Sequence, residues 1–222
     1  MTHGIKSVLG CSVKLLHVSD LHFNQAQFEW ITEQLCNYDV LCISGDLLDD
    51  SLNQTLSSEE QIEWIKQWTL TLTVPTFICS GNHDQVEVEN DELPSARWLN
   101  KLKKDHLYLD GNIVEVGGFR FGCMPYENPN FNQFRDCDVL LHHVPPSKLK
   151  VAKEAGEDWG CPDILAAIKL GELQAKYILC GHVHQPHARF SRFKKRIISN
   201  PGSTHSADKP NFNAITLTDS EK

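Results

Sequence analysis

Residues 14–22 read KLLHVSDLH and residues 40–46 read VLCISGD. In both stretches an apolar, strand-forming run passes directly into polar residues, and such runs are typical of strands buried on both faces of a sheet. Between the two runs, residues 25–38 carry apolar side chains at three- and four-residue intervals, as an amphipathic helix does. The order strand, helix, strand predicts two parallel strands joined by a right-handed crossover.

The same alternation continues along the chain. Residues 59–72 predict a second helix and residues 76–79 a third buried strand, which together indicate a largely parallel first sheet. Gly117-Gly118 is a two-residue hairpin signal between expected strands at 112–116 and 120–124. The remaining elements suit a second, mixed sheet, with strands over 139–141, 177–179, 188–193, 197–198 and 214–217 and a helix over 162–170. No linker or repeat interrupts them, so we expect one α/β domain over residues 1–222.

The composition is that of a globular protein, with 41% hydrophobic and 23% charged residues. The 29 acidic side chains exceed the 21 basic ones, and the formal charge of −8 argues against general attraction to nucleic acid or anionic membranes. No window approaches the roughly 18 apolar residues of a membrane span, and the apolar stretch at 8–11 is too short for a secretion signal. The eight cysteines are scattered without a Cys-x-x-Cys pair, which disfavours a zinc ribbon and favours free thiols. We therefore expect a soluble, cytoplasmic protein.

Five of the predicted strands run directly into side chains that can bind metal. These are Asp20 and His22, Asp46 and Asp49, Asn82 to Asp84, His142 and His143, and His182 and His184. The carboxyl ends of strands line the ligand crevice of an open α/β sheet, so the five ends should converge. Residues i and i+2 of an extended segment point the same way, which lets an Asp-x-His or His-x-His pair grip one cluster. A carboxylate such as Asp46 can bridge two cations about 3.5–4 Å apart, and the mixed nitrogen and oxygen set suits Mn, Fe, Co, Ni or Zn.

Taken singly, these motifs are weak signals. An isolated Asp-x-His or Gly-Asp is more often a cap or a turn than a ligand, and an isolated His-x-His is as often a surface turn. Three polar residues at 82–84 directly after a buried strand are a stronger signal, because buried polar groups cost free energy without partners. The ordered conjunction of all five leaves little room for a purely structural interpretation.

The chain resembles the calcineurin-like metallophosphoesterase superfamily in five motifs that occur in the same order: Asp20-x-His22, Gly45-Asp46, Gly81-Asn82-His83-Asp84, His142 or His143, and Gly181-His182-x-His184. The resemblance implies a four-layer α-β-β-α sandwich of two mixed sheets flanked by helices, with a dinuclear metal site at the sheet edges. It assigns the first divalent ion to Asp20, His22, Asp46 and His184. It assigns the second to Asp46, Asn82, His182 and one of the paired histidines, with His142 at the family's usual position and His143 behind it.

The resemblance also narrows the reaction. Protein Ser/Thr phosphatases of the superfamily carry an arginine shortly after the second motif, whereas residues 45–50 read GDLLDD here. That stretch and HHVPP at 142–146 are more similar to small phosphodiesterases, including the cyclic-nucleotide class. The implied substrate is a small phosphodiester, a nucleotide among the candidates, and the alternative is a phosphomonoesterase or phosphoprotein phosphatase. A nuclease is disfavoured by the charge of −8, and a non-catalytic scaffold like the retromer subunit of this fold by the complete ligand set.

The mechanism expected from the resemblance is attack on phosphorus by a hydroxide shared between two ions. Asn82 would help to neutralise phosphoryl charge, His83 would protonate the leaving group, and Asp84 would orient His83. Asp49 is expected to support the site or to cap a helix. The oligomeric state is left open.

Other residues carry weaker signals. Tyr126 and Trp159 are expected either to rim the pocket or to pack in the core. We expect the basic cluster near the C-terminus to be a solvated β-hairpin and the acidic cluster after the third motif to repel long polyanions. The two clusters are Arg189, Arg192, Lys194, Lys195 and Arg196, and Glu87, Glu89, Asp91 and Glu92.

Overall fold

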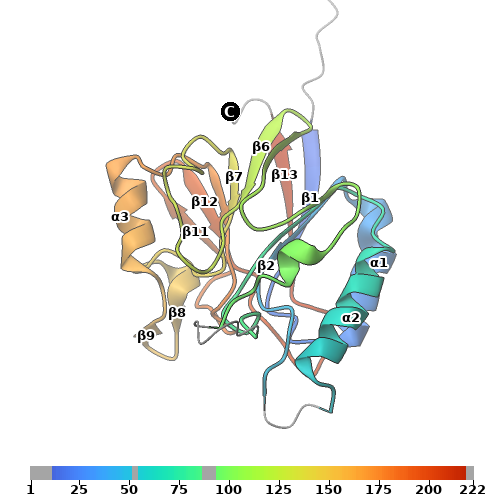
Figure 1. Cartoon of the computed structure of the whole chain (residues 1–222). Helices are drawn as coiled ribbons and strands as arrows, with labels where there is room; N and C mark the ends of the chain where they lie inside the picture. Colours follow the sequence, from blue (N-terminus) through green and yellow to red (C-terminus); the bar gives the residue numbers. More distant parts are fainter. Residues whose placement is uncertain (1–11, 52–54, 87–93, 219–222) are drawn as a thin grey trace, which may run out of the picture.

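The computed structural model describes residues 12–51, 55–86 and 94–218 of the chain (Figure 1). The short apolar stretch at 8–11 and the acidic cluster at 87–92 lie outside the described residues. Within the described ranges, no helix combines the length and the apolar character needed to cross a lipid bilayer.

The first sheet has five strands in the order β13-β1-β2-β3-β4. Four of them are parallel: β1 (Ser12–Val18), β2 (Val40–Ser44), β3 (Thr76–Cys79) and β4 (Leu107–Tyr108). The fifth, β13 (Asn213–Thr218), pairs antiparallel with β1 at the edge. Strands β2 and β3 are buried along their whole length, as their continuous apolar sequences predict.

The second sheet has six strands in the order β11-β12-β10-β7-β6-β5. Their bounds are β5 (Ile113–Val116), β6 (Phe119–Cys123), β7 (Val139–Leu141), β10 (Tyr177–Leu179), β11 (Phe190–Phe193) and β12 (Arg196–Ser199). The four central strands are parallel and the two edge pairs are antiparallel hairpins. Gly117 and Gly118 join β5 to β6 with φ values of 58° and 78°, the left-handed pair that a two-residue hairpin turn requires.

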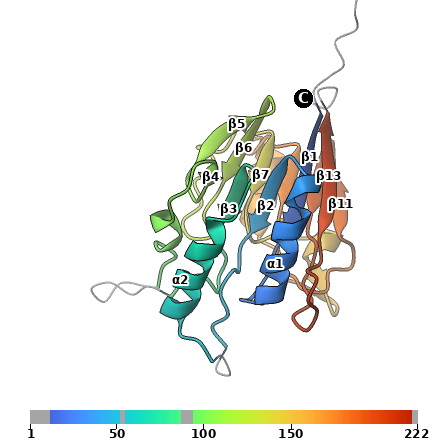
Figure 2. The ribbon, with the colours of Figure 1, turned by 90° about the vertical axis from the view of Figure 1, so that its right-hand side faces the viewer.

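Helices cover the outer face of each sheet. Helices α1 (Gln25–Gln34) and α2 (Ser58–Thr69) cover the first sheet, as Figure 2 shows, and α3 (Pro162–Leu170) covers the second. In Figure 1 the layers run from α3 on the left to α1 and α2 on the right. Three short 3₁₀ helices and a small hairpin complete the described elements: η1 (Leu35–Asn37), η2 (Leu99–Lys101), η3 (Lys150–Ala152), β8 (Lys153–Glu154) and β9 (Glu157–Asp158). The expected four-layer α-β-β-α sandwich is confirmed.

Three apolar clusters separate the four layers. Along the central strands alternate residues enter different clusters, because successive side chains point to opposite faces of a sheet. Leu16 and Val18 of β1, for example, face the helices, whereas Leu15 faces the second sheet. Between the sheets, the rings of Phe77 and Phe121 stack with centroids 4.5 Å apart. Because this central cluster draws on both sheets, a single domain over residues 1–222 stays our prediction.

One strand was predicted in the wrong sheet. The strand expected at 214–217 was assigned to the second sheet, but β13 pairs with β1 in the first, with Ile215 opposite Leu15. Its alternating burial shows that it is an edge strand with one covered face, and that pattern alone does not identify its partner. The short strand β4 and the β8–β9 hairpin were not expected, because strands of two residues leave no periodic signal.

Candidate metal centre

The loops after β1 and β2 are hydrogen-bonded to each other. The amide of Asp20 donates to the carbonyl of Gly45 at 3.0 Å, and the amide of His22 donates to the carbonyl of Asp46 at 3.1 Å. Asp20, His22 and Asp46 have φ values of 54°, 40° and 55°, a region that non-glycine residues seldom occupy. Strained backbone of this kind is concentrated at functional sites, where the surrounding structure holds it in place.

Two glycines let the remaining loops approach this pair. A Cβ atom at Gly81 would lie 2.1 Å from Oδ1 of Asp46, and one at Gly181 would lie 2.4 Å from Oδ2 of Asp20. Both distances are far below contact, so only glycine fits. The loops after β3 and β10 therefore close against the two carboxylates, as the Gly-Asn-His-Asp and Gly-His-x-His motifs led us to expect.

Asp46 lies between two groups of candidate ligands. We call the first group, Asp20, His22, Asp46 and His184, the first metal position. In it Nε2 of His184 is 3.2 Å from Nε2 of His22 and 3.6 Å from Oδ1 of Asp20. Nε2 of His22 is also 4.0 Å from Oδ2 of Asp46.

We call the second group of candidate ligands, Asp46, Asn82, His143 and His182, the second metal position. Oδ2 of Asp46 is 3.1 Å from Nε2 of His143. Oδ1 of Asn82 is 3.0 Å from that same nitrogen and 3.0 Å from Nδ1 of His182. One carboxylate oxygen of Asp46 thus faces both positions, as a bridging ligand must.

These spacings fit metal coordination. Ligand atoms bound at about 2.1 Å in tetrahedral or octahedral geometry stand about 3.0–3.4 Å from one another, which is the separation of most of the pairs above. The donors are imidazole nitrogens with carboxylate and amide oxygens, a set suited to borderline divalent cations. In the described part of the chain, Asp20, Asp46 and His143 form one of the groups that could hold an ion, and all three are buried.

The geometry favours His143 over His142 as the metal ligand, whereas the sequence analysis favoured His142. The two residues follow β7, in which Val139 and Leu141 face the other sheet and Leu140 faces α3. Because side chains alternate, His142 continues on the α3 side, where its Nδ1 lies 3.3 Å from the carbonyl of Met124. His143 continues on the inter-sheet side, where the ligands converge, and we therefore propose His143 as the ligand.

Replacing His143 by alanine is expected to reduce occupancy of the second metal position strongly, whereas the same change at His142 should leave most of it. The reason is that the Nε2 atom of His143, and not the ring of His142, points toward Asp46 and Asn82. Anomalous diffraction from Mn²⁺-soaked crystals of both variants measures the two occupancies. Greater loss in His142→Ala would restore the order expected from the sequence.

His83 has a different partner from the one expected. Its Nδ1 is 2.5 Å from Oδ1 of Asp50, and its amide donates to Oδ1 of Asp46 at 2.9 Å. The expectation that Asp84 orients His83 is wrong. The buried carboxylate of Asp84 instead accepts backbone amide hydrogens from both metal loops, at Asp46, Leu47, Leu48 and Gly81. Asp84 therefore holds the second and third motifs together, and Asp50 holds the His83 ring.

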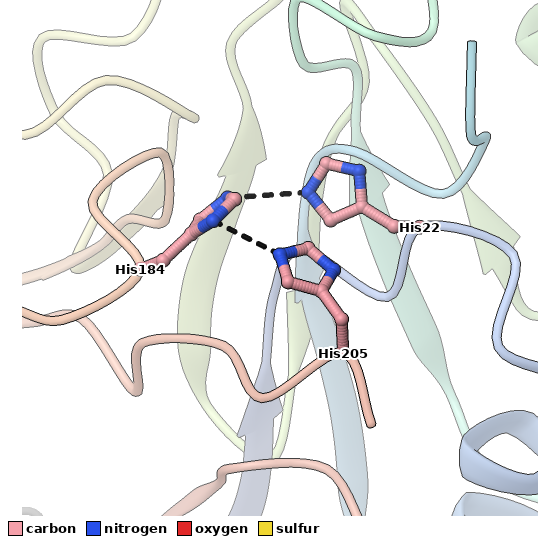
Figure 3. A group of neighbouring side chains, drawn as sticks. All are labelled: His22, His184 and His205. Carbon is pink, nitrogen blue, oxygen red and sulfur yellow. Dashed lines mark hydrogen bonds between the residues drawn. The ribbon is translucent and has the colours of Figure 1, made fainter. Parts of the chain in front are cut away.

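A further histidine, the exposed His205, lies beside His22 and His184 of the first metal position (Figure 3). Its Nε2 is 3.1 Å from Nδ1 of His184, and its ring centroid is 4.6 Å from that of His22. The loop that carries it is fixed by Ser203, whose hydroxyl donates to the carbonyl of Asp20 at 2.7 Å. His205 was not singled out from the sequence because it follows no buried strand directly.

A family model for calcineurin-like phosphoesterases matches residues 13–186, which include every residue of the two metal positions. The chain belongs to the calcineurin-like phosphoesterase family. A relative named "Probable glycerophosphodiester phosphodiesterase GpdQ", from Arcobacter nitrofigilis, is 27% identical over 165 residues. That alignment covers 66% of this chain and 57% of the relative, so the match spans little more than half of the relative's length.

Two solved structures share the fold of this chain. The protein TT1561 of Thermus thermophilus superposes with a TM-score of 0.59 at 12% identity, over 90% of this chain and 98% of its own. The purple acid phosphatase PPD1 from yellow lupin (Lupinus luteus) seeds superposes with a TM-score of 0.51 at 15% identity, over 78% of this chain and 38% of its own. At such identities the likeness extends to the fold alone.

The electrostatics of the candidate site favour a negative charge on the Asp46 carboxylate and a positive charge on His143. Burial by itself lowers the pKa of His143, but the adjacent Asp46 carboxylate outweighs it and raises the pKa to about 9. In the metal-free protein this pair stabilises the fold fully below the unperturbed value of 6.5, and the contribution is lost as the pH rises through 9. Burial, followed by the charge of Asp46, raises the pKa of Asp84 to about 7. A cation that needs the unprotonated His143 ring therefore displaces a proton, and its affinity rises with pH.

The remaining expectations concern the surroundings. The ring of Tyr126 lies 6.0 Å from that of His143, so Tyr126 borders the site, whereas Trp159 is 51% exposed. The Asp49 side chain bonds within its own loop, where its Oδ1 accepts a hydrogen bond from the amide of Ser51 at 2.8 Å. The basic cluster lies on the β11–β12 hairpin, as expected.

Proposed function

We propose that this chain is a metal-dependent phosphodiesterase that hydrolyses small phosphodiesters. The observation that supports it best is Oδ2 of Asp46, which faces His143 at 3.1 Å and His22 at 4.0 Å and so can be shared by two cations. The ions expected are two divalent ones from the set Mn, Fe, Co, Ni and Zn. Bound there, they would supply a nucleophile from water near neutral pH and neutralise phosphoryl charge.

The protein's own side chains would bind and protonate the substrate. The side-chain amide of Asn82 lies beside the second metal position, where its NH₂ group can donate to a phosphoryl oxygen. His83 is half-buried beside Asp46, and Asp50 holds its Nδ1, which leaves Nε2 to meet the leaving-group oxygen. His205 lies next to His22 and His184.

The charges around the site favour a diester over a monoester. Among the described residues, the charged side chains found against the candidate ligands and His83 are histidines and carboxylates, for example Asp84 beside Asp46 and Asp50 beside His83. A monoester dianion gains most from an arginine clamp, whereas a monoanionic diester can bind with less help. The name of the Arcobacter relative, a probable glycerophosphodiester phosphodiesterase, agrees with this preference.

With Mn²⁺ present, we expect a higher kcat/KM for bis-p-nitrophenyl phosphate than for p-nitrophenyl phosphate, after correction for their intrinsic reactivities. A panel of glycerophosphodiesters, cyclic nucleotides and phosphopeptides then identifies the natural class. Fast release of phosphate from phosphopeptides would overturn the diester proposal and favour the phosphoprotein phosphatase alternative, while leaving the metal centre untouched.

We also infer that the protein works in a reducing compartment such as the cytoplasm. The cysteines of the described ranges are free thiols, and most of them are buried. Burial raises the pKa of the Cys137 thiol to about 11, which suits inert packing rather than reactivity.

A further inference from the structure

His17 is a polar residue in the middle of the apolar layer between the two sheets. It lies on β1 and faces the same side as Val13 and Leu15, whose side chains belong to the inter-sheet cluster. Its side chain is fully buried. Nε2 lies 2.8 Å from the hydroxyl oxygen of Ser44, and Nδ1 lies 2.8 Å from that of Ser199. The ring therefore joins β2 of the first sheet to β12 of the second.

The neighbours of His17 form a polar layer directly beneath the metal centre. We call it the inter-sheet polar layer, and it consists of His17, Ser44, Ser199 and Asn213. Ser44 is the last residue of β2, before the loop that carries Asp46, and Ser199 is the last residue of β12, before the loop that carries His205. All four side chains are buried, so each depends on the others for hydrogen bonds.

Ser44 connects this layer to the second metal position. Its carbonyl accepts a hydrogen bond from Nδ1 of His143 at 2.8 Å and another from the hydroxyl of Ser19 at 2.9 Å. Because a carbonyl only accepts, Nδ1 of His143 carries the proton and Nε2 is the nitrogen that faces Asp46 and Asn82. The Ser44 carbonyl therefore fixes the orientation of the ring and holds the Nδ1 proton, so that Nε2 is the nitrogen that a cation would meet.

We propose that His17 is a positioning residue for the second metal position, which it serves by holding Ser44 and hence the carbonyl that orients His143. The inference rests on the proposed function only in taking His143 as a ligand. It also explains a costly feature, since a histidine in this apolar layer is tolerated only when both ring nitrogens have partners.

The ring is well suited to this role. Burial lowers the pKa of His17 to about 3, so the ring is neutral at physiological pH. A neutral imidazole has one donor and one acceptor nitrogen, and a serine hydroxyl can take either role, so both bonds form whichever tautomer is present. The Ser199 hydroxyl is held in turn by the amide of Asn213, 2.9 Å away.

Two amide substitutions separate positioning from general stability. The amide of glutamine reaches about as far as Nε2 of histidine, on the Ser44 side, whereas that of asparagine reaches about as far as Nδ1, on the Ser199 side. Each variant should lose one of the two bonds and show a similar fall in Tm. His17→Asn should weaken binding of the second Mn²⁺ by about 10-fold, the lower end of the ~10–100-fold cost of losing an outer partner, whereas His17→Gln should stay within about 2-fold of wild type.

Mn²⁺ binding is followed by electron paramagnetic resonance, and the Nδ1–H signal of His143 by ¹⁵N NMR of the metal-free protein. The proposal expects that signal to persist in His17→Gln and to weaken in His17→Asn. Equal Mn²⁺ affinities and equal signals in the two variants would overturn it and make His17 a purely structural residue. If wild type takes up no second Mn²⁺ but the signals still differ, the dinuclear function fails while the positioning role stands.

Should either His17 variant fail to fold, the matched pair Ser44→Ala and Ser199→Ala replaces it. Both serines are fully buried and each bonds one nitrogen of His17. Ser44→Ala should weaken both the binding of the second Mn²⁺ and the Nδ1–H signal of His143. Ser199→Ala should lower Tm but change the Mn²⁺ affinity and the His143 signal little. Equal effects of the two serine variants would contradict the proposal.

Discussion

Replacing Asp46 by asparagine is expected to lower kcat/KM for a phosphodiester by at least about 10³-fold, beyond the ~10–100-fold cost of losing an outer partner of a ligand. Oδ2 of Asp46 faces both metal positions, at 3.1 Å from His143 and 4.0 Å from His22. Asparagine has nearly the same shape but lacks the negative charge that two cations would share. We therefore expect both ions to be lost or weakened together.

Elemental analysis of the purified variant, with kcat/KM measured at increasing Mn²⁺, tests this expectation. Asp138→Asn is a matched control, because Asp138 precedes β7 at the end far from the site and its carboxylate accepts the amide of Arg120 at 2.8 Å. The control should bind two ions with unchanged turnover. An Asp46→Asn enzyme that kept both ions and near wild-type activity would show that Asp46 is not the shared ligand.

The convergence of the strand ends could be predicted from the sequence for a physical reason. A strand buried on both faces must be apolar throughout, so the abrupt change to Asp20 after β1 and to Asp46 after β2 marks the sheet edge. Parallel strands bring their carboxyl ends to one edge, and the loops do meet there.

The alternation of side chains along a strand predicts which of the two paired histidines faces the metal ligands. In β7, Leu141 faces the opposite sheet, so parity places His143 rather than His142 on the same side. The same rule places His17 in the inter-sheet layer, two residues beyond Leu15 on β1. Alternation along a strand is thus a local signal that distinguishes adjacent residues of identical type.

Contacts that join distant loops could not be predicted in this way. His205 meets His184 only because the loop after β12 is bonded to the loops after β1 and β10. Asp84 follows His83 directly in the third motif, whereas Asp50 belongs to the loop after β2. Which of these two carboxylates pairs with the His83 ring depends on the path of the loop after β2. Nothing in the order of residues determines that path.

Replacing His83 by alanine is expected to lower kcat by about 10²–10⁴-fold, the usual contribution of a positioned general acid, while both ions stay bound. The imidazole lies outside the two metal positions as defined above, and its Nδ1 pairs with Asp50. Its amide, which alanine retains, donates to Oδ1 of Asp46. Metal content and kcat should therefore separate, unlike in Asp46→Asn.

The dependence of the kcat loss on the leaving group shows which role His83 has. If it donates a proton, the loss in His83→Ala should shrink for nitrophenyl esters, which need little protonation, and be largest for alkyl esters. Asp50→Asn should show the same trend with a smaller loss, because it disturbs only the partner of Nδ1. His187→Ala, an exposed histidine in the loop after β10, is the control that should keep wild-type kcat. A loss independent of leaving-group pKa would instead assign His83 to charge stabilisation, since a hydrogen bond to a phosphoryl oxygen does not depend on the group that departs.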